Sequence, residues 1–239
     1  MGAITVGGLL AGSPAEAGAA RFFDSGVIDP ASLVGGWTST GTSYSSVVGD
    51  KKFTIGLQPI SFGPGGNVQE GDISFHSPTS GVFTGLISFR DPATNLGLAG
   101  PSSGTFTYTV EITDPNHTFD QAWLSTVVEW PGADGTPIQV TKTIDYLDIS
   151  APDVVIGPTL DGSSTPPVSL SRSQSLKITD SWTIPATGKP TFFGPTNPVL
   201  RSFVNSYTQA PGPLPVLGAG AAFGFSRKLR GRVRQARGL

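Results

Sequence analysis

The sequence has no cysteine, two histidines and few charges, since only 13% of its 239 residues are Asp, Glu, Lys or Arg. The missing cysteine excludes disulfide frameworks, thiolate zinc sites and thiol nucleophiles. His76 and His117 offer little material for a metal site built on imidazole. Scarce charge argues against a disordered chain and against long surface helices, whose solvent-facing sides need Glu, Lys and Arg. We therefore expect a soluble β-rich body with no cofactor and no metal.

Turn-forming residues are abundant, with 32 glycines and 21 prolines. They separate short segments in which apolar and polar residues alternate, the pattern of half-buried strands. We predict strands at 53–57, 72–76, 82–89, 105–113, 123–130, 138–147 and 175–184, with shorter ones at 36–44, 154–156 and 200–208, and a long loop at 157–175. No helical crossover is visible between them, so the fold class is all-β: an antiparallel β-sandwich or jelly roll spanning residues 18–209.

The clearest alternation lies in two of these segments. In 105–113 the apolar positions are Phe106, Tyr108, Val110 and Ile112, which we expect to point inward. In 175–184 the inward phase holds Leu176, Ile178, Trp182 and Ile184, but it also holds Asp180. An acid in that phase is most simply a carboxylate at a turn or strand end, hydrogen bonded to backbone.

The first 17 residues have the features of an export signal. Residues 2–12 are small or aliphatic, and Ala15 and Ala17 place small side chains where a signal peptidase requires them. No Lys or Arg precedes Arg21, so the usual basic start is missing. A start codon assigned too far downstream explains this, and a flexible Gly/Ala-rich terminus of a cytosolic protein is the alternative.

The last 30 residues, 210–239, have a different composition from the body. Pro211, Gly212, Pro213, Leu214 and Pro215 come first, followed by an uncharged, mostly apolar run that contains Val216, Leu217, Gly220, Phe223, Gly224 and Phe225. Six of the fifteen basic residues then fall within 227–239, where no acid occurs, including Arg227, Lys228, Arg230, Arg232 and Arg234. Cations directly after an apolar segment are typical of its cytoplasmic side. We predict a short C-terminal membrane-anchor helix with the body outside the cell.

This order of proline motif, apolar segment and arginine-rich end resembles the PEP-CTERM family of sorting signals, in a variant found on cyanobacterial secreted proteins. The family's usual Pro-Glu-Pro is Pro211-Gly212-Pro213 here. The resemblance implies recognition of 211–215 by a membrane protease of the exosortase type, a membrane segment at 216–226 and a cytoplasmic stop at 227–237. Both cleavage and retention of the tail are compatible with this pattern.

Two other interpretations of the tail remain. A basic arm for nucleic acid leaves the apolar run unexplained, and residues 1–226 are acidic, with nine basic against seventeen acidic side chains. We therefore expect no nucleic-acid partner. An amphipathic surface helix over 227–239, with Leu229 and Val233 among the cations, is the second alternative.

The body carries no complete catalytic or metal-binding motif. Asp72, Glu111, Glu129, Asp145, Asp148 and Asp180 are the candidates for the carboxylate pair of a glycosidase. Calcium would need converging loop oxygens, for which Asp134-Gly135 and Asp161-Gly162-Ser163-Ser164 are the candidates, although both are typical of turns. No G-x-S-x-G motif is present. Trp37, Trp123, Trp130 and Trp182, with Tyr44, Tyr108, Tyr146 and Tyr207, form either a sugar-stacking platform or part of the core.

We interpret the chain as an exported, non-enzymatic β-sandwich with a structural or adhesive role at the cell surface or in extracellular polymer. The expected partners are a sorting protease, the membrane, and polysaccharide or surface proteins. The alternatives are a carbohydrate-active enzyme and a calcium-dependent carbohydrate-binding module. Asp180 beside a second acid in a concave site favours the enzyme, whereas dispersed acids on a polar sheet favour adhesion.

Overall fold

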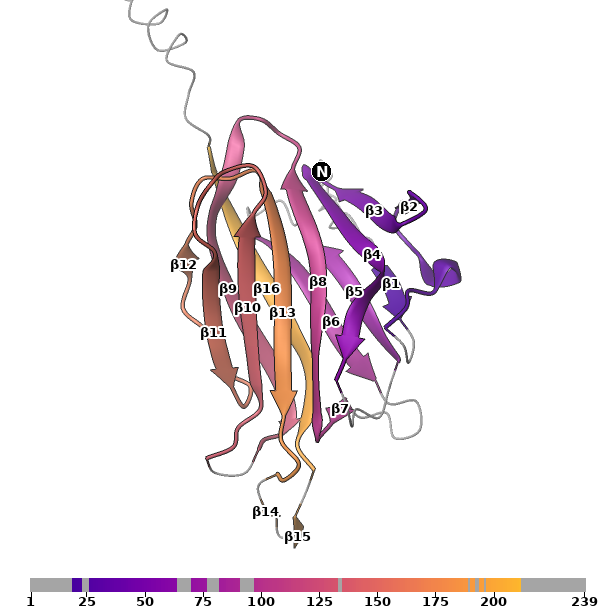
Figure 1. Cartoon of the computed structure of the whole chain (residues 1–239), viewed down its shortest axis with the longest axis vertical. Helices are drawn as coiled ribbons and strands as arrows, with labels where there is room; N and C mark the ends of the chain where they lie inside the picture. The colour runs from indigo at the N-terminus through magenta and orange to yellow at the C-terminus, as the bar shows by residue number, and fades with distance from the viewer. Residues whose placement is uncertain are drawn as a thin grey trace, which may run out of the picture.

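Two antiparallel sheets of seven strands each face one another across a shared apolar interior (Figure 1). The computed structural model describes residues 19–22, 26–63, 70–76, 82–90, 97–132, 135–188, 190–191, 194–195 and 197–211. The prediction of an all-β, antiparallel sandwich is therefore confirmed. The predicted anchor helix and signal segment lie outside the described residues.

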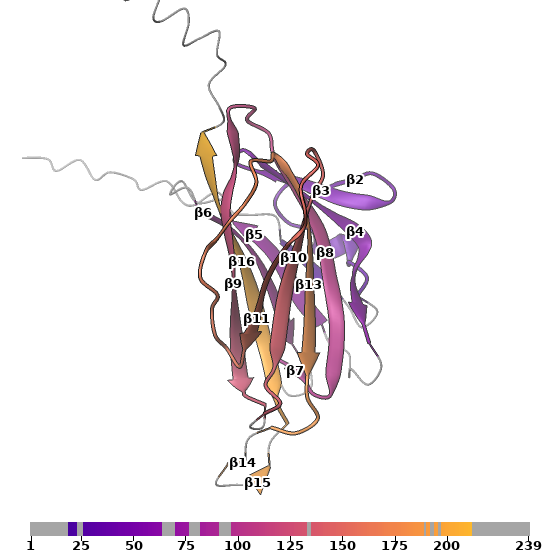
Figure 2. The same cartoon turned by 60° about the vertical axis from the view of Figure 1, so that its left-hand side comes forward.

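The first sheet has the order β1-β5-β6-β16-β9-β12, and β7 also pairs with β16. Its strands are β1 (Ala19–Phe22), β5 (Glu70–His76), β6 (Val82–Arg90), β7 (Leu98–Ala99), β9 (His117–Trp130), β12 (Val168–Ser169) and β16 (Val199–Pro211). The last strand is central, between β6 and β9. Its C-terminal end lies at the top of the sandwich in Figure 2.

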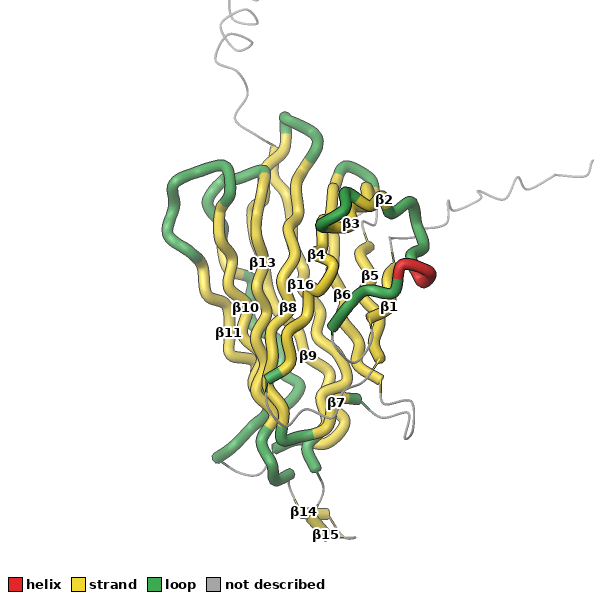
Figure 3. Tube along the Cα trace, turned by 45° about the vertical axis from the view of Figure 1, so that its right-hand side comes forward, coloured by secondary structure: helices red, strands yellow, loops and turns green. Residues whose placement is uncertain are grey.

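The second sheet has the order β11-β10-β13-β8-β4-β3-β2. Its strands are β2 (Thr38–Ser39), β3 (Ser43–Val48), β4 (Lys51–Phe62), β8 (Ser102–Ile112), β10 (Gln139–Tyr146), β11 (Val154–Leu160) and β13 (Ser175–Ile184). A short pair, β14 (Pro190–Thr191) and β15 (Gly194–Pro195), projects at one end, and a 3-10 turn, η1 (Pro30–Ser32), follows β1 (Figure 3).

The alternation predicted the buried faces because side chains point to opposite sides of a strand in turn. All four predicted inward residues of β8 are buried, and so are those of β13, whose bounds match the prediction. Rings from both sheets meet in the interior. Phe53 of β4 stacks on Phe75 of β5 at 4.2 Å between ring centroids, and Trp182 of β13 lies 5.2 Å from Phe89 of β6.

The predicted long loop at 157–175 is wrong in part. Strand β11 continues to Leu160, and residues beyond it run along β9 as an irregular edge. The amides of Thr165 and Leu170 donate to main-chain oxygens of β9. Pro166 and Pro167 lack amide protons, so they interrupt the strand without removing it from the sheet.

Candidate functional site

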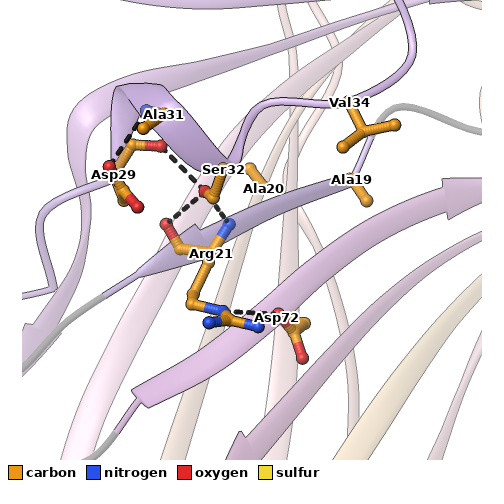
Figure 4. Close-up of a pocket in the computed structure, with 8 residues that line it drawn as sticks. All are labelled: Ala19, Ala20, Arg21, Asp29, Ala31, Ser32, Val34 and Asp72. Atoms are coloured by element: carbon orange, nitrogen blue, oxygen red, sulfur yellow. Dashed lines mark hydrogen bonds and ion pairs between the residues drawn. The ribbon is translucent and has the colours of Figure 1, made fainter.

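A surface pocket of about 410 Å³ lies between β1, η1 and β5 (Figure 4). The side chains of Arg21 and Asp72 form an exposed ion pair across it at 3.6 Å. The Ser32 hydroxyl accepts from the Arg21 amide at 2.7 Å and donates to the Asp29 carbonyl at 2.8 Å. These polar groups are already hydrogen bonded or ion paired with one another. We therefore interpret the pocket as a structural feature of the junction between β1 and η1.

The surface candidates for a glycosidase pair are dispersed, and the contacts of each are with cations, hydroxyls or amides. Four form ion pairs: Asp72 with Arg21, Glu111 with Lys52, Glu129 with Arg201 and Asp145 with Lys177. Asp148 accepts from the Ser173 hydroxyl and from the Gln174 amide. Each of these five carboxylates is therefore engaged in a separate local contact.

The loop candidates occupy turns. Asp161 has a φ of 48°, and its Oδ1 accepts from the amides of Gly132 and Ile138, each at 2.9 Å. His117 opens β9 with Nδ1 2.8 Å from Oδ2 of Asp114. Within the described part of the chain, no group of three or more His, Asp or Glu residues is placed to hold a metal. Asp134 lies outside the described residues, and His76 ends β5, exposed.

The tryptophans divide between core and surface. Trp182 is fully buried, and Trp37 packs against the core with its ring 6.0 Å from that of Phe75. Trp123 and Trp130 are half-buried on β9. Three of the tyrosines, Tyr44, Tyr108 and Tyr207, are buried, so most of the rings proposed for sugar stacking belong to the interior.

Asp180 occupies a different place from the one predicted. It lies in the middle of β13, fully buried at 0% exposure, and its Oδ2 is 2.5 Å from Nδ2 of Asn205 in the opposite sheet. The interpretation as a turn or strand-end carboxylate bound to backbone is therefore wrong. Its cross-strand partner on β10 is Lys142, also 0% exposed, and not a second acid.

Lys142 crosses the interior from the second sheet to the first. Its Nζ donates to the Trp123 carbonyl of β9 at 2.7 Å and lies 4.5 Å from the centre of the Tyr207 ring on β16. Asn205, also 0% exposed, is two residues before Tyr207 and points to the same interior face. Lys142, Asp180 and Asn205 therefore form a cluster, the buried triad, that joins β10, β13 and β16.

Burial sets the protonation of the buried triad. Desolvation raises the pKa of Asp180 to about 7, although Lys142 and the Asn205 amide oppose the shift. Desolvation lowers the pKa of Lys142 to about 7, opposed by Asp180. Each charged form is destabilised by the absence of water. A neutral amine and a protonated carboxyl group are therefore accessible near neutral pH.

Two tyrosines complete the polar interior. The hydroxyls of Tyr108 and Tyr207 are 2.6 Å apart, and the Tyr108 hydroxyl also contacts the Asn205 amide. Burial raises the pKa of both phenols well above their ordinary value. They remain neutral hydrogen-bonding groups beside the triad.

Sequence reasoning identified Asp180 as unusual but missed Lys142 and Asn205. A signal was present, because Lys142 shares the phase of Val140 and Ile144, both buried. Asn205 likewise shares the phase of Phe203 and Tyr207. A polar residue in the inward phase of three separate strands indicates a buried polar cluster.

The sorting-signal residues lie mostly beyond the described chain. Pro211 is the last residue of β16 and pairs with His117. Gly212, Pro213, Leu214, Pro215, the predicted membrane segment, the basic stop and the cleavage residues Ala15 and Ala17 lie outside the described residues. In the described ranges, no helix has the length and apolar character needed to span a bilayer.

Comparisons with known proteins do not assign a family. No protein-family model and no curated protein sequence matches this chain. Among solved structures it is similar to an exo-beta-1,3-galactanase from Phanerochaete chrysosporium with galactose, at 10% identity and a TM-score of 0.20. The match covers 78% of this chain and 68% of the galactanase. A likeness at this level carries no functional argument.

Proposed function

We propose that this protein is an exported β-sandwich that serves a structural or adhesive role at the cell surface or in extracellular polymer, sorted there by its C-terminal tail. The observation that carries the proposal is the composition of residues 211–239, with prolines, an uncharged run and an acid-free basic end in that order. This order fits a membrane segment whose basic end is cytoplasmic.

The body supports a binding or scaffolding role. The surface acids are dispersed in separate ion pairs, and the outward positions of β8 and β13 are mostly Ser and Thr. Such faces can offer many hydroxyls to a polysaccharide or a surface protein without a deep cleft. The exposed Val155 and Leu160 on the edge strand β11 add apolar contact area.

Cell fractionation tests the sorting claim. We compare the full chain with a chain that ends at Pro211, which keeps the pairing of β16 with His117. The full chain is expected in the membrane fraction and accessible to protease added outside intact cells, and the truncated chain in the medium. A matched control replaces Arg227, Lys228 and Arg230 with Gln, which weakens the cytoplasmic stop while retaining the apolar run.

Equal distribution of the full and truncated chains would contradict sorting by the tail. The adhesive role has its own measurement, which is retention of the secreted truncated chain on the producing cells' extracellular polysaccharide. Retention that heat denaturation abolishes is expected, because the folded faces supply the contacts. Indifference to both polysaccharide and cell-surface protein would overturn the adhesive part of the proposal.

A further inference from the structure

The buried triad is a costly arrangement for a sandwich interior. A lysine, an aspartate and an asparagine, all 0% exposed, meet among aromatic rings. Burial removes water from both side chains and so destabilises the charged form of each. Oδ1 of Asp180 and Oδ1 of Asn205 have no hydrogen-bond partner. Buried polar atoms without partners are uncommon in folded proteins and call for a physical explanation.

We propose that Lys142 and Asn205 become joined by an intramolecular isopeptide bond between Nζ of Lys142 and Cγ of Asn205, with Asp180 as the catalytic carboxyl group. The bond would connect β10 of one sheet to β16 of the other. The inference does not depend on where the protein is located, because all three residues belong to the folded body.

The geometry brings the reacting groups together. Nζ of Lys142 is held by the Trp123 carbonyl, and in the β9–β16 pairing Trp123 faces Ser206, the residue after Asn205. The same Nζ lies over the ring of Tyr207, whose side chain shares a face with that of Asn205. These contacts place the amine at the face of β16 that carries the Asn205 amide, and the proposed reaction requires rotation about the last side-chain bonds of Lys142 to bring Nζ to Cγ.

The protonation states suit the reaction. An amine attacks a carbonyl only when neutral, and desolvation lowers the pKa of Lys142. A general acid must hold a proton, and desolvation raises the pKa of Asp180. The carboxyl group is already 2.5 Å from the Asn205 amide, so a half-turn of that amide brings Oδ1 to the acid.

The reaction balances without any further reagent. The lone pair of neutral Nζ forms a bond to Cγ, and the C–O π electrons move to Oδ1, which accepts a hydrogen bond from protonated Asp180. The carboxyl group then relays one proton from Nζ to Nδ2. The Cγ–Nδ2 bond breaks, ammonia leaves, and a secondary amide remains. Asp180 ends protonated, as it began.

The product gives a hydrogen-bond partner to the Asn205 oxygen, which has none in the reactants. The new amide N–H can keep the bond to the Trp123 carbonyl, and the new amide oxygen accepts from Asp180. The buried amine, whose charged form is destabilised by desolvation, becomes an amide that cannot carry a charge. A purely ionic role for Lys142 and Asp180 lacks this gain.

Peptide mapping of the full chain, purified in detergent, tests the proposal. Trypsin does not cut after an acylated lysine, so the bond would yield residues 91–172 joined to the peptide that begins at Ser202. The branched peptide is expected to be lighter than the sum of its two components by about 17 Da, the mass of the lost ammonia. Tandem mass spectrometry would locate the branch at Lys142 and Asn205.

Variants separate this bond from other sources of the same mass loss. Lys142→Arg and Asn205→Ala should each eliminate the branched peptide. Asp180→Asn keeps the side-chain shape but removes the acid, and should reduce the branched yield to below about one tenth of wild type. Lys51→Arg is the matched control at the other buried lysine, and should leave the yield unchanged.

The proposal is overturned if wild-type protein yields free 91–142 and 143–172 with unmodified masses. It is also overturned if the mass loss persists in Lys142→Arg, which would indicate a cyclised asparagine. A branched peptide at full yield in Asp180→Asn would remove Asp180 from the reaction. Because the first measurement uses the wild-type chain, poor folding of a variant cannot obscure the result.

Discussion

Lys51 and Lys142 are both buried in the sandwich, and each lies over an aromatic ring, yet their surroundings differ. Lys51 begins β4 at one end of the interior, 5.0 Å from the centre of the Phe83 ring, and pairs with Asp50, whose side chain is 33% exposed. Lys142 lies between the sheets with Asp180, which has no contact with solvent. The carboxylate next to Lys51 is therefore partly exposed to solvent, whereas the carboxylate next to Lys142 is fully buried.

The difference shows that burial alone does not define a reactive lysine. Burial lowers the pKa of Lys51 as well, but the Asp50 carboxylate opposes the shift. The side chain of Asp50 is 33% exposed, so this partner of Lys51 keeps contact with water. Asp180 has lost solvent, so its own anion is destabilised along with the ammonium of Lys142. Of these two environments, the one around Lys142 favours the uncharged forms of both the amine and the carboxyl group.

Replacing each lysine by methionine is expected to give the largest difference between the two environments, measured as the loss in the free energy of unfolding. Lys142→Met removes the proposed bond and leaves the Asp180 carboxyl group buried without its partner, at an expected loss of about 3–5 kcal/mol in the free energy of unfolding. Lys51→Met leaves Asp50 able to turn to water, at an expected loss of at most about 1 kcal/mol. Urea denaturation followed by tryptophan fluorescence measures both.

A double variant distinguishes the stranded carboxyl group from general disruption of packing. Lys142→Met with Asp180→Leu removes both polar partners and should recover part of the stability lost in Lys142→Met, because apolar replacement of a buried pair is often neutral. Equal losses in Lys142→Met and Lys51→Met would show that the two sites are equivalent and that the contrast is wrong.

The tyrosine pair beside the triad should show an intermediate effect. Tyr108→Phe or Tyr207→Phe removes one hydroxyl from a buried 2.6 Å hydrogen bond and leaves the other without that partner. Each is expected to cost about 1–3 kcal/mol, while the double variant should cost less than the sum. Thermal unfolding of the four proteins gives the coupling, and strict additivity would show that the hydroxyls do not depend on each other.

Local alternation explains why much of the fold was predictable. The bounds of β13 and the buried faces of β8 and β13 follow from a period of two, which needs no knowledge of the rest of the chain. The edge after β11 was missed because its prolines and glycines obscure a segment that pairs irregularly with β9. Its structure depends on the neighbouring strand, whose position the local pattern does not give.

At the buried triad, too, the local sequence pattern predicts which side chains are buried but not which of them are in contact. The phase of β13 placed Asp180 inside, but its partners come from the register of β10 against β13 and from the facing of β16 across the interior. Lys142 is 38 positions before Asp180, and Asn205 is 25 positions after it. No local pattern links residues so far apart, so only the tertiary fold could identify them as partners.

The smallest expected effect contrasts a surface acid with the buried one. The Asn116 amide, and then His117, donate to Asp114 and lower its pKa below the ordinary 3.8, the opposite direction to Asp180. A carboxylate with a depressed pKa stabilises the fold fully above its unfolded pKa, and this contribution is lost as the pH falls through its folded value. Asp114→Ala should therefore flatten the fall in stability below about pH 4. Denaturation midpoints measured from pH 2 to 7 test this, and an unchanged acid slope would show that the turn does not hold Asp114 ionised.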